Sequence, residues 1–335
     1  MRLVFITQRV NSSDPVLAAT VPKIQALAAR VDELVVLAQS GRSDGLSPNV
    51  ELRTFGSQVR LGRGWKFERE VTRALPADAV IAHMVPLYVI LAAPIVRARR
   101  TPILLWYTHW HRSLRLRAAE RLATAIVSVD RRSFPLKSSK VRAIGHGIDL
   151  KEFPCTSREP SESLRALVLG RYSGAKGLPT ILDGVRLAQS LGLEVSLEVR
   201  GPATTRPERL NRFFLQAWRF RLDGPIHRGG VPELFSRTDV LVNNMRAGAP
   251  DKVVYEAAAS CLPVVASNPV FDELFDGFPL SFEQDDARSL AQRLLWFASL
   301  SPEERTEIGR VLRERVARRH SVETWADGIL AAVRR

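Results

Sequence analysis

The sequence predicts an α/β protein made of two doubly wound domains, each with a parallel, Rossmann-like sheet. Short apolar runs of strand length alternate with amphipathic windows of helical length along the chain. This alternation is typical of βαβ units, in which a helix connects two parallel strands. The 335 residues, 45% of them hydrophobic, suffice for two cores of roughly 150 residues each. We therefore expect two domains that face each other across a cleft.

The expected elements follow in chain order. In the first half we predict strands at 3–7, 33–38 and 79–82 and a helix over 16–29. In the second half we predict strands at 168–170 and 194–200 and a helix over 179–191. Gly, His and Pro residues interrupt the alternation at 145–154. We place the junction there, with domains at 1–150 and 151–320 followed by a last helix within 321–335.

One apolar segment, residues 79–96, approaches the length of a membrane-spanning helix. It is interrupted by His83, Pro86 and Pro94, which favours a strand, a loop and a buried helix over 87–96. Residues 1–7 have a strand pattern and not that of a secretory signal, so we expect the mature chain to begin at Met1.

The chain is strongly basic, with 49 Lys and Arg against 35 Asp and Glu and a net charge of +14. The imbalance is steepest at 97–142, where twelve cations face only Glu120 and Asp130. This favours reversible contact with an anionic membrane surface. Nucleic acid is not expected, because no helix-turn-helix, metal finger or basic aromatic strand is present. An Arg-rich composition spread over solvated faces is the alternative.

The two cysteines, Cys155 and Cys261, allow one bridge at most. Each adjoins an apolar element, so we expect both to be reduced in a cytoplasmic protein.

A carboxylate-bearing helix is predicted directly after a strand in the second half. The strand at 238–243 leads into a loop rich in Gly and Pro, after which Asp251 is placed to cap a helix. Lys252 and Glu256 are four residues apart and share one helix face. The unpaired N–H groups of the first turn, which includes Val253, suit a negative ligand. An ordinary surface ion pair is the alternative.

A second motif, at 167–180, has a strand, a basic loop with glycines, and a helix start. Arg171 offers a planar fork of donors for oxyanions, and Lys176 offers a mobile point charge. Gly170 and its neighbours Gly174 and Gly177 allow the backbone to approach a phosphate closely. This combination suits a diphosphate.

Together the two motifs resemble the C-terminal half of GT-B glycosyltransferases, in particular the retaining glycosyltransferase family four (glycosyl transferase group 1). Four further blocks resemble a bacterial branch of that family, and they occur in its order: 82–88, 105–109, 113–117 and 144–149. The resemblance covers nearly the whole chain. It implies an N-terminal acceptor-side domain, a C-terminal nucleotide-sugar domain and a last helix that crosses back to the first domain.

The resemblance implies transfer of a hexose-type sugar from a nucleoside diphosphate to an envelope-directed or lipid-linked acceptor. Arg171, Lys176 and the helix start at 251–253 would stabilise the departing diphosphate, with no metal or other cofactor. Glu256 would accept the ribose hydroxyls. The base would lie against the loop that contains His227 and Val231. We expect such an enzyme to be cytoplasmic and peripheral to the inner face of the plasma membrane.

On the acceptor side, His109 follows the apolar strand at 103–107 and matches the family histidine beside the sugar. It is the first candidate for a catalytic residue. His83 and His146 are weaker candidates, and Asp14 in the first loop is placed to contact a sugar or to cap a helix.

One position departs from the broad family pattern. Most members have a glutamate eight residues before the ribose-binding one, and Gly248 stands there in this chain. A nucleotide-sugar-binding relic with reduced activity therefore remains an alternative. A sugar-nucleotide 2-epimerase of the same fold is a weaker one, because its set of acid and base side chains is not evident.

Overall fold

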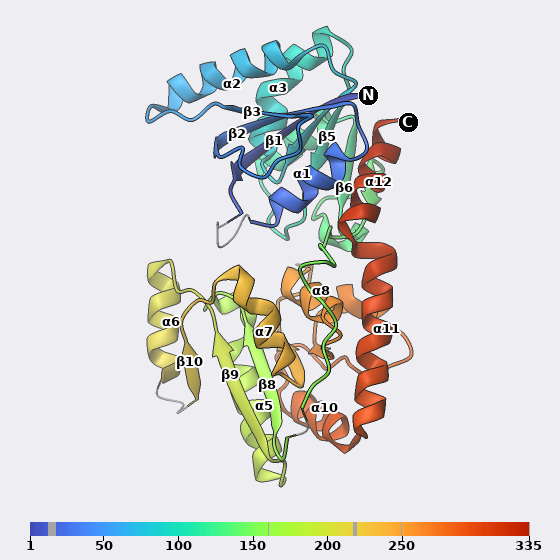
Figure 1. The fold of residues 1–335 in the computed structure, drawn as a ribbon. Coiled ribbons are helices and arrows are strands. Elements are labelled where there is room, and N and C mark those ends of the chain that lie inside the picture. The colour runs from blue at the N-terminus through green and yellow to red at the C-terminus, as the bar shows by residue number, and fades with distance from the viewer. Residues whose placement is uncertain (13–17, 160, 217–219, 249, 335) are drawn as a thin grey trace. The chain divides into compact units, whose positions relative to one another are not determined.

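The computed structural model describes residues 1–12, 18–159, 161–216, 220–248 and 250–334. The chain forms two compact units (Figure 1). Unit 1 consists of residues 1–149 and 319–335, and unit 2 consists of residues 150–318. The predicted fold class is confirmed, because both units are α/β and both sheets are parallel.

Unit 1 contains a seven-stranded sheet in the order β3-β2-β1-β4-β5-β6-β7. Its strands are β1 (Arg2–Val10), β2 (Glu33–Gly41), β3 (Val50–Thr54), β4 (Ala79–His83), β5 (Ile103–Trp106), β6 (Ala125–Ser128) and β7 (Val141–Ala143). The buried parts of the central strands are mainly apolar, as is typical of a doubly wound sheet that helices cover on both faces. The strand order reverses direction between β1 and β4, which are neighbours in the sheet.

The helices of unit 1 are α1 (Thr20–Ala28), α2 (Arg60–Ala74), α3 (Pro86–Ala98), α4 (Leu114–Leu122) and α12 (Val322–Val333), with a 3₁₀ turn η1 (Arg131–Ser133). α3 begins with Pro86 at its first position, where a missing N–H costs no hydrogen bond. The apolar segment at 79–96 is thus a strand and a partly buried helix, as predicted. None of the described helices combines the length and the apolar character that crossing a membrane requires.

Unit 2 contains a five-stranded sheet in the order β10-β9-β8-β11-β12. Its strands are β8 (Leu164–Leu169), β9 (Val195–Arg200), β10 (Arg221–Asp223), β11 (Val240–Asn243) and β12 (Val264–Ala266). Here too the order reverses between two neighbouring strands, β8 and β11. Ligands of such sheets bind beyond the carboxyl ends of the strands at the reversal, so this edge is the place to look for a site.

The helices of unit 2 are α5 (Leu178–Ser190), α6 (Arg206–Gln216), α7 (Val231–Ser236), α8 (Lys252–Ala259), α9 (Asp272–Phe275), α10 (Ala287–Ser299) and α11 (Pro302–His320). The last two residues of α11 belong to unit 1. Three 3₁₀ turns, η2 (Gly174–Lys176), η3 (Arg228–Gly230) and η4 (Pro269–Phe271), complete the unit.

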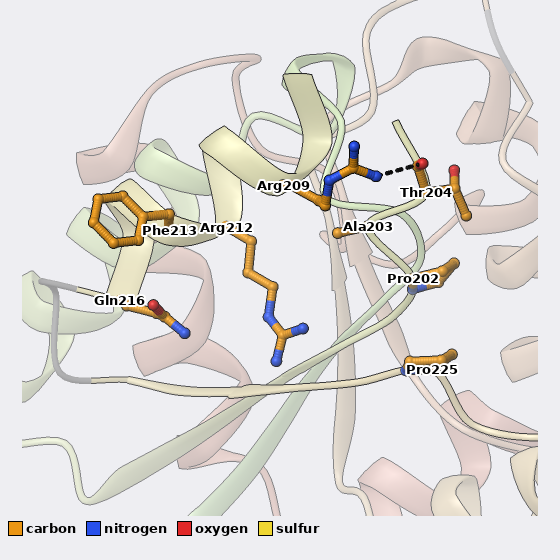
Figure 2. Close-up of a pocket in the computed structure, with 8 residues that line it drawn as sticks. All are labelled: Pro202, Ala203, Thr204, Arg209, Arg212, Phe213, Gln216 and Pro225. Carbon is orange, nitrogen blue, oxygen red and sulfur yellow. Dashed lines mark hydrogen bonds between the residues drawn. The ribbon is translucent and has the colours of Figure 1, made fainter. Parts of the chain in front are cut away.

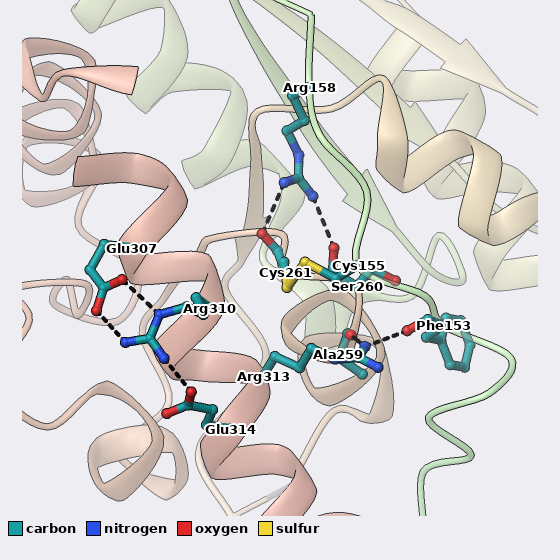
Figure 3. Close-up of a disulfide and its surroundings, with 10 residues drawn as sticks. All are labelled: Phe153, Cys155, Arg158, Ala259, Ser260, Cys261, Glu307, Arg310, Arg313 and Glu314. Carbon is teal, nitrogen blue, oxygen red and sulfur yellow. Dashed lines mark hydrogen bonds and ion pairs between the residues drawn. A yellow bond between two sulfur atoms is a disulfide. The ribbon is translucent and has the colours of Figure 1, made fainter. Parts of the chain in front are cut away.

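The expectation of two reduced cysteines is wrong. Cys155 and Cys261 form a disulfide across 106 residues of sequence (Figure 3). Cys261 directly follows the last turn of α8 and has a φ of 56°. Arg158 donates to the backbone oxygens of Ser260 and Cys261 at 3.3 and 2.9 Å. The start of unit 2 is thereby fixed to the end of α8, a contact that local sequence patterns do not reveal.

Candidate functional site

The two predicted motifs lie at the same edge of the unit 2 sheet. The 167–180 motif leaves the carboxyl end of β8, and the 251–256 motif follows β11. β8 and β11 are hydrogen-bonded neighbours at the reversal of strand order. The fold therefore brings together two loops that are some 70 residues apart in the sequence, at the edge where such sheets bind ligands.

Gly170 allows the first loop to turn back on itself. It has a φ of 141°, and a Cβ there would lie 2.5 Å from Lys176 Nζ. A Cβ at Gly201, at the end of the neighbouring strand β9, would lie 1.9 Å from the backbone oxygen of Gly170. Side chains at either position would displace the loop, so both glycines are needed for the close approach.

Lys176 is held between the two loops. Its side chain is 9% exposed, donates to the backbone oxygen of Leu169 at 3.4 Å and pairs with the Asp251 carboxylate. Asp251 also accepts a hydrogen bond from Asn243 Nδ2 at 2.7 Å. A charged lysine that is this buried needs such a partner. An anionic ligand that reached Lys176 would compete with Asp251 for the ammonium group.

The predicted cap at Asp251 is wrong in its chemistry. Asp251 occupies the N-cap position of α8, but its side chain accepts no hydrogen bond from the helix. It is directed to Lys176 and Asn243 instead. A buried ammonium group attracts a carboxylate more strongly than a neutral backbone N–H does, which explains the choice.

Arg171 is directed toward α6. Its guanidinium is 58% exposed and lies 3.4 Å from Glu208. Glu208 also accepts hydrogen bonds from Thr204 and Thr205 at 2.9 and 3.0 Å. Burial disfavours its charged form, but these hydrogen bonds and Arg171 outweigh that cost and lower the pKa of Glu208 below its usual value. The Arg171 guanidinium is thus accessible, and the ionised Glu208 carboxylate holds it in position.

Glu256 is the centre of a second charged network. Its Oε1 lies 2.9 Å from Lys252 Nζ and 3.0 Å from Arg228 Nη1, and the residue is 6% exposed. The predicted pairing of Lys252 with Glu256 on one helix face is thus observed. Arg228 also pairs with Glu152, at 2.5 and 2.7 Å. Burial disfavours its charge, but Glu256 and Glu152 outweigh burial and raise the pKa of Arg228.

Three of these residues were not recognised from the sequence: Glu152, Arg228 and Asn243. Arg228 belongs to the predicted base-binding loop, in which His227 and Val231 were the residues predicted to contact the base. His227 is exposed and its Nδ1 accepts from the Gly229 N–H at 3.2 Å. Val231 and, at the start of α8, Val253 are nearly buried, at 8% and 7% exposure. Arg228, a cation in the same loop, is the residue that contacts Glu256, and its charge was the sequence feature that indicated this contact.

A cavity of about 550 Å³ adjoins α6 in unit 2 (Figure 2). It is lined by Pro202, Ala203, Thr204, Arg209, Arg212, Phe213, Gln216 and Pro225. Arg209 donates to the backbone oxygen of Thr204 at 2.9 Å. Thr204, which lines the cavity, also donates a hydrogen bond to Glu208, the partner of Arg171. One loop therefore contributes both to the cavity and to the position of Glu208.

In unit 1, the histidines that the sequence singled out differ in accessibility. His109 is exposed just beyond β5, accepts from the His111 N–H at 3.0 Å and stacks with Trp110 at 5.4 Å. His83, the last residue of β4, is 6% exposed and its Nδ1 lies 3.1 Å from Thr7 Oγ1. Burial, helped by the charge of Lys23, lowers the pKa of His83 to about 3. The imidazole of His83 is therefore neutral and enclosed at physiological pH, and its role on the acceptor side stays a prediction.

The other two acceptor-side candidates are His146 and Asp14. His146 is 7% exposed, and Asp14 lies outside the described residues.

A basic hollow of about 360 Å³ was not predicted as a site. Its lining includes Arg112 from the loop after β5, Arg131 and Arg132 from η1, and Lys137. Such a hollow suits an anionic group of a ligand.

Comparisons with known proteins agree with the fold described above. Residues 186–331 match a family model described as glycosyl transferase-like. The solved structure of HepE from Anabaena in complex with UDP is 19% identical, covers 100% of both chains and has a TM-score of 0.78. The chain has the GT-B glycosyltransferase fold. The resemblance to GT-B glycosyltransferases is thereby confirmed, while membership of family four and of a bacterial branch stays a prediction.

Other GT-B structures are similar over the same length. Sucrose-phosphate synthase from Thermosynechococcus elongatus is 16% identical, with a TM-score of 0.75 and coverage of 100% of this chain and 98% of that one. The lipopolysaccharide outer core galactosyltransferase WaaB is 13% identical, with a TM-score of 0.69 and 99% coverage of both chains. No curated protein matches the chain in sequence.

Proposed function

We propose that this GT-B protein is a retaining glycosyltransferase that moves a hexose from a nucleoside diphosphate sugar to a lipid-linked or other cell-envelope acceptor. The observation that carries the proposal is the meeting of the β8 and β11 loops, with Lys176 from one and the start of α8 from the other. Structures of HepE contain UDP and UDP-glucose. UDP sugars are therefore the first donors to test.

The chemistry asked of the site is stabilisation of a leaving group. The anomeric C–O bond breaks and the diphosphate departs with the electron pair. The acceptor oxygen bonds to the anomeric carbon, and its proton passes to the departing diphosphate oxygen. Arg171, Lys176 and the N–H groups at the start of α8 would hold the growing negative charge. Such cations and dipoles can act without a metal ion or other cofactor, which is part of the proposal.

Glu256 would bind the ribose. A carboxylate with two acceptor oxygens suits a pair of vicinal hydroxyls. Lys252 and Arg228 fix the position of Glu256, since both contact the same oxygen, Oε1. The other oxygen, Oε2, is then the one we assign to the ribose. The base would lie against the His227–Val231 loop.

The acceptor would bind to unit 1. His109 is the proposed catalytic residue there, because it is exposed at the carboxyl end of β5, where ligands of such sheets bind. The basic hollow formed by Arg112, Arg131, Arg132 and Lys137 supports an acceptor that carries a phosphate. Reversible contact of the basic 97–142 region with the inner face of the plasma membrane, from the cytoplasm, completes the proposal.

A nucleotide-sugar-binding relic is the second candidate, and Gly248 motivates it. The residue has a φ of 83°, a conformation in which a glutamate would be strained. The usual sugar-binding carboxylate is therefore unsuited to this backbone, and Asp251 and Lys252 would have to contact the sugar instead.

Product analysis tests the proposal. The protein is incubated with UDP-glucose, UDP-galactose and other nucleotide sugars, with and without a membrane lipid extract, and with EDTA. Transfer predicts labelled sugar in the lipid or glycan fraction, with free nucleoside diphosphate formed only when acceptor is present. Binding of a donor without any turnover across acceptors favours the relic, and a new sugar nucleotide without acceptor contradicts both.

A further inference from the structure

The two faces of α2 in unit 1 are both apolar at its N-terminal half. The inward face is held by Phe67, whose ring lies 5.1 Å from Phe55 and 5.5 Å from Tyr88. On the other side, Leu61 is 87% exposed and Trp65 is 62% exposed. These two residues are four apart and therefore share one face. Packing of the unit 1 core explains Phe67 but not Leu61 or Trp65.

The helix that bears this outward apolar surface is basic. Between Leu61 and Ala74, α2 has four cations, Arg63, Lys66, Arg69 and Arg73, and two carboxylates, Glu68 and Glu70. Glu70 is turned inward, at 6% exposure, and pairs with Arg69 and Arg73. The Arg69 guanidinium also lies 5.0 Å from the Trp65 ring centroid. Glu68 is the one exposed carboxylate of the helix.

Val59 extends the apolar surface by one residue before the helix begins. It is 64% exposed and occupies the N-cap position of α2. We call the surface formed by Val59, Leu61 and Trp65, together with Lys66 and Arg69, the α2 face. Its composition is that of an interfacial helix, whose apolar side chains enter the headgroup region while cations contact anionic lipids. Tryptophan in particular favours the membrane–water interface.

We propose that the α2 face docks this protein onto an anionic lipid bilayer, with Leu61 and Trp65 inserted among the headgroups. Charge complementarity selects a bilayer as the occupant, since the whole chain has a net charge of +14 and α2 adds cations at the edge of its apolar surface. The inference deepens the proposed membrane contact, but it assigns it to a helix outside the 97–142 region. It does not depend on sugar transfer.

Vesicle sedimentation of the full-length protein tests the inference. Vesicles of phosphatidylglycerol and phosphatidylcholine are compared with phosphatidylcholine alone, at low and high salt. The test variant is Leu61→Ser/Trp65→Ser. The matched control is Phe213→Ser/Phe214→Ser on α6, because these residues are 67% and 66% exposed and also neighbour arginines. Brominated lipids report insertion as the quenching lost in Trp65→Phe.

The expected result is binding to the anionic vesicles that weakens at least about tenfold in the α2 variant and persists in the α6 control. Trp65 should account for most of the quenching. Wild-type binding that the α2 variant retains would overturn the inference while leaving the proposed membrane contact intact. Absence of any vesicle binding would overturn both, whereas loss of a dimer in the α2 variant would overturn the α2 assignment alone, in favour of a protein partner. Thermal shift by nucleoside diphosphates tests donor binding separately in every variant.

Discussion

The two units have sheets of the same kind, but their interiors are stabilised by different chemistry. Unit 2 has a disulfide between Cys155 and Cys261 and a charged network around Glu256. Unit 1 also has a buried carboxylate, Glu70, that pairs with Arg69 and Arg73, but it has no disulfide, since both cysteines of the chain belong to unit 2. It contains two neutral histidines, the buried His83 and the half-buried His320, each with a pKa lowered to about 3 chiefly by burial. The same kind of fold therefore contains a covalent cross-link in unit 2 and neutral histidines with lowered pKa values in unit 1. The difference makes each unit sensitive to its own perturbation.

Reduction should produce the largest effect, and only in unit 2. The bridge closes a loop of about a hundred residues, and loss of such a bridge costs on the order of 2–5 kcal/mol. Hydrogen exchange of unit 2 peptides should accelerate in dithiothreitol, while unit 1 peptides remain protected. The double variant Cys155→Ser/Cys261→Ser should reproduce the change and no longer respond to reductant. Equal acceleration in both units would contradict a stabilisation confined to unit 2.

Loss of the buried lysine should produce the next largest effect, on turnover. Lys176→Ala removes a preorganised cation from the proposed diphosphate site and should lower kcat by roughly 10²-fold. Arg171→Ala should act in the same direction. Arg186→Ala on the exposed face of α5 is the control, with kinetics expected to match the wild type. Kinetics unchanged in Lys176→Ala would remove the diphosphate assignment.

Acid should destabilise unit 1. In the unfolded chain His83 and His320 bind protons below about pH 6.5, whereas in the folded unit they stay neutral down to about pH 3. The free energy of unfolding is therefore fully retained above pH 6.5 and falls as the pH drops toward 3, by at most about 1.4 kcal/mol per pH unit for each histidine. Hydrogen exchange between pH 7 and 5, corrected for intrinsic rates, measures the slope.

His83→Gln is the control for the acid prediction. It removes the titrating group and retains a partner for Thr7, so the slope in unit 1 should be roughly halved. Unit 2 has one histidine, His227, which is exposed, so unit 2 peptides serve as the reference that lacks a buried histidine. A unit 1 slope that His83→Gln leaves unchanged would assign the acid sensitivity to other groups.

The smallest predicted effect concerns the ribose contact. Glu256→Gln should weaken nucleotide binding by about tenfold and leave kcat at saturating donor nearly unchanged, because a ribose contact is made equally in ground and transition states. Calorimetry with the nucleoside diphosphate and steady-state kinetics separate the two quantities. Abolished turnover at saturating donor would show that Glu256 acts in the chemical step.

Local patterns predicted much of the fold and part of the site. Strand and helix periodicity located both sheets, and the four-residue spacing of Lys252 and Glu256 predicted their shared face. Pairings between distant residues were not predicted. The disulfide joins residues 106 apart, and Arg228 reaches Glu152 across 76 residues. Asp251 occupies the N-cap position as expected, but its carboxylate pairs with Lys176 and not with the helix, because this tertiary contact is stronger than a local cap.

The central claim is that the β8 and β11 loops of unit 2 bind a nucleoside diphosphate. Hydrogen exchange and thermal unfolding are measured with UDP, GDP, ADP, TDP and CDP, with and without EDTA, for the wild type and Lys176→Ala. One nucleotide at about 100 times its Kd should stabilise the wild type by about 2.7 kcal/mol. The account predicts that protection appears in unit 2 peptides around Lys176 and Glu256 and is lost in Lys176→Ala. Absence of stabilisation by all five nucleotides would contradict it.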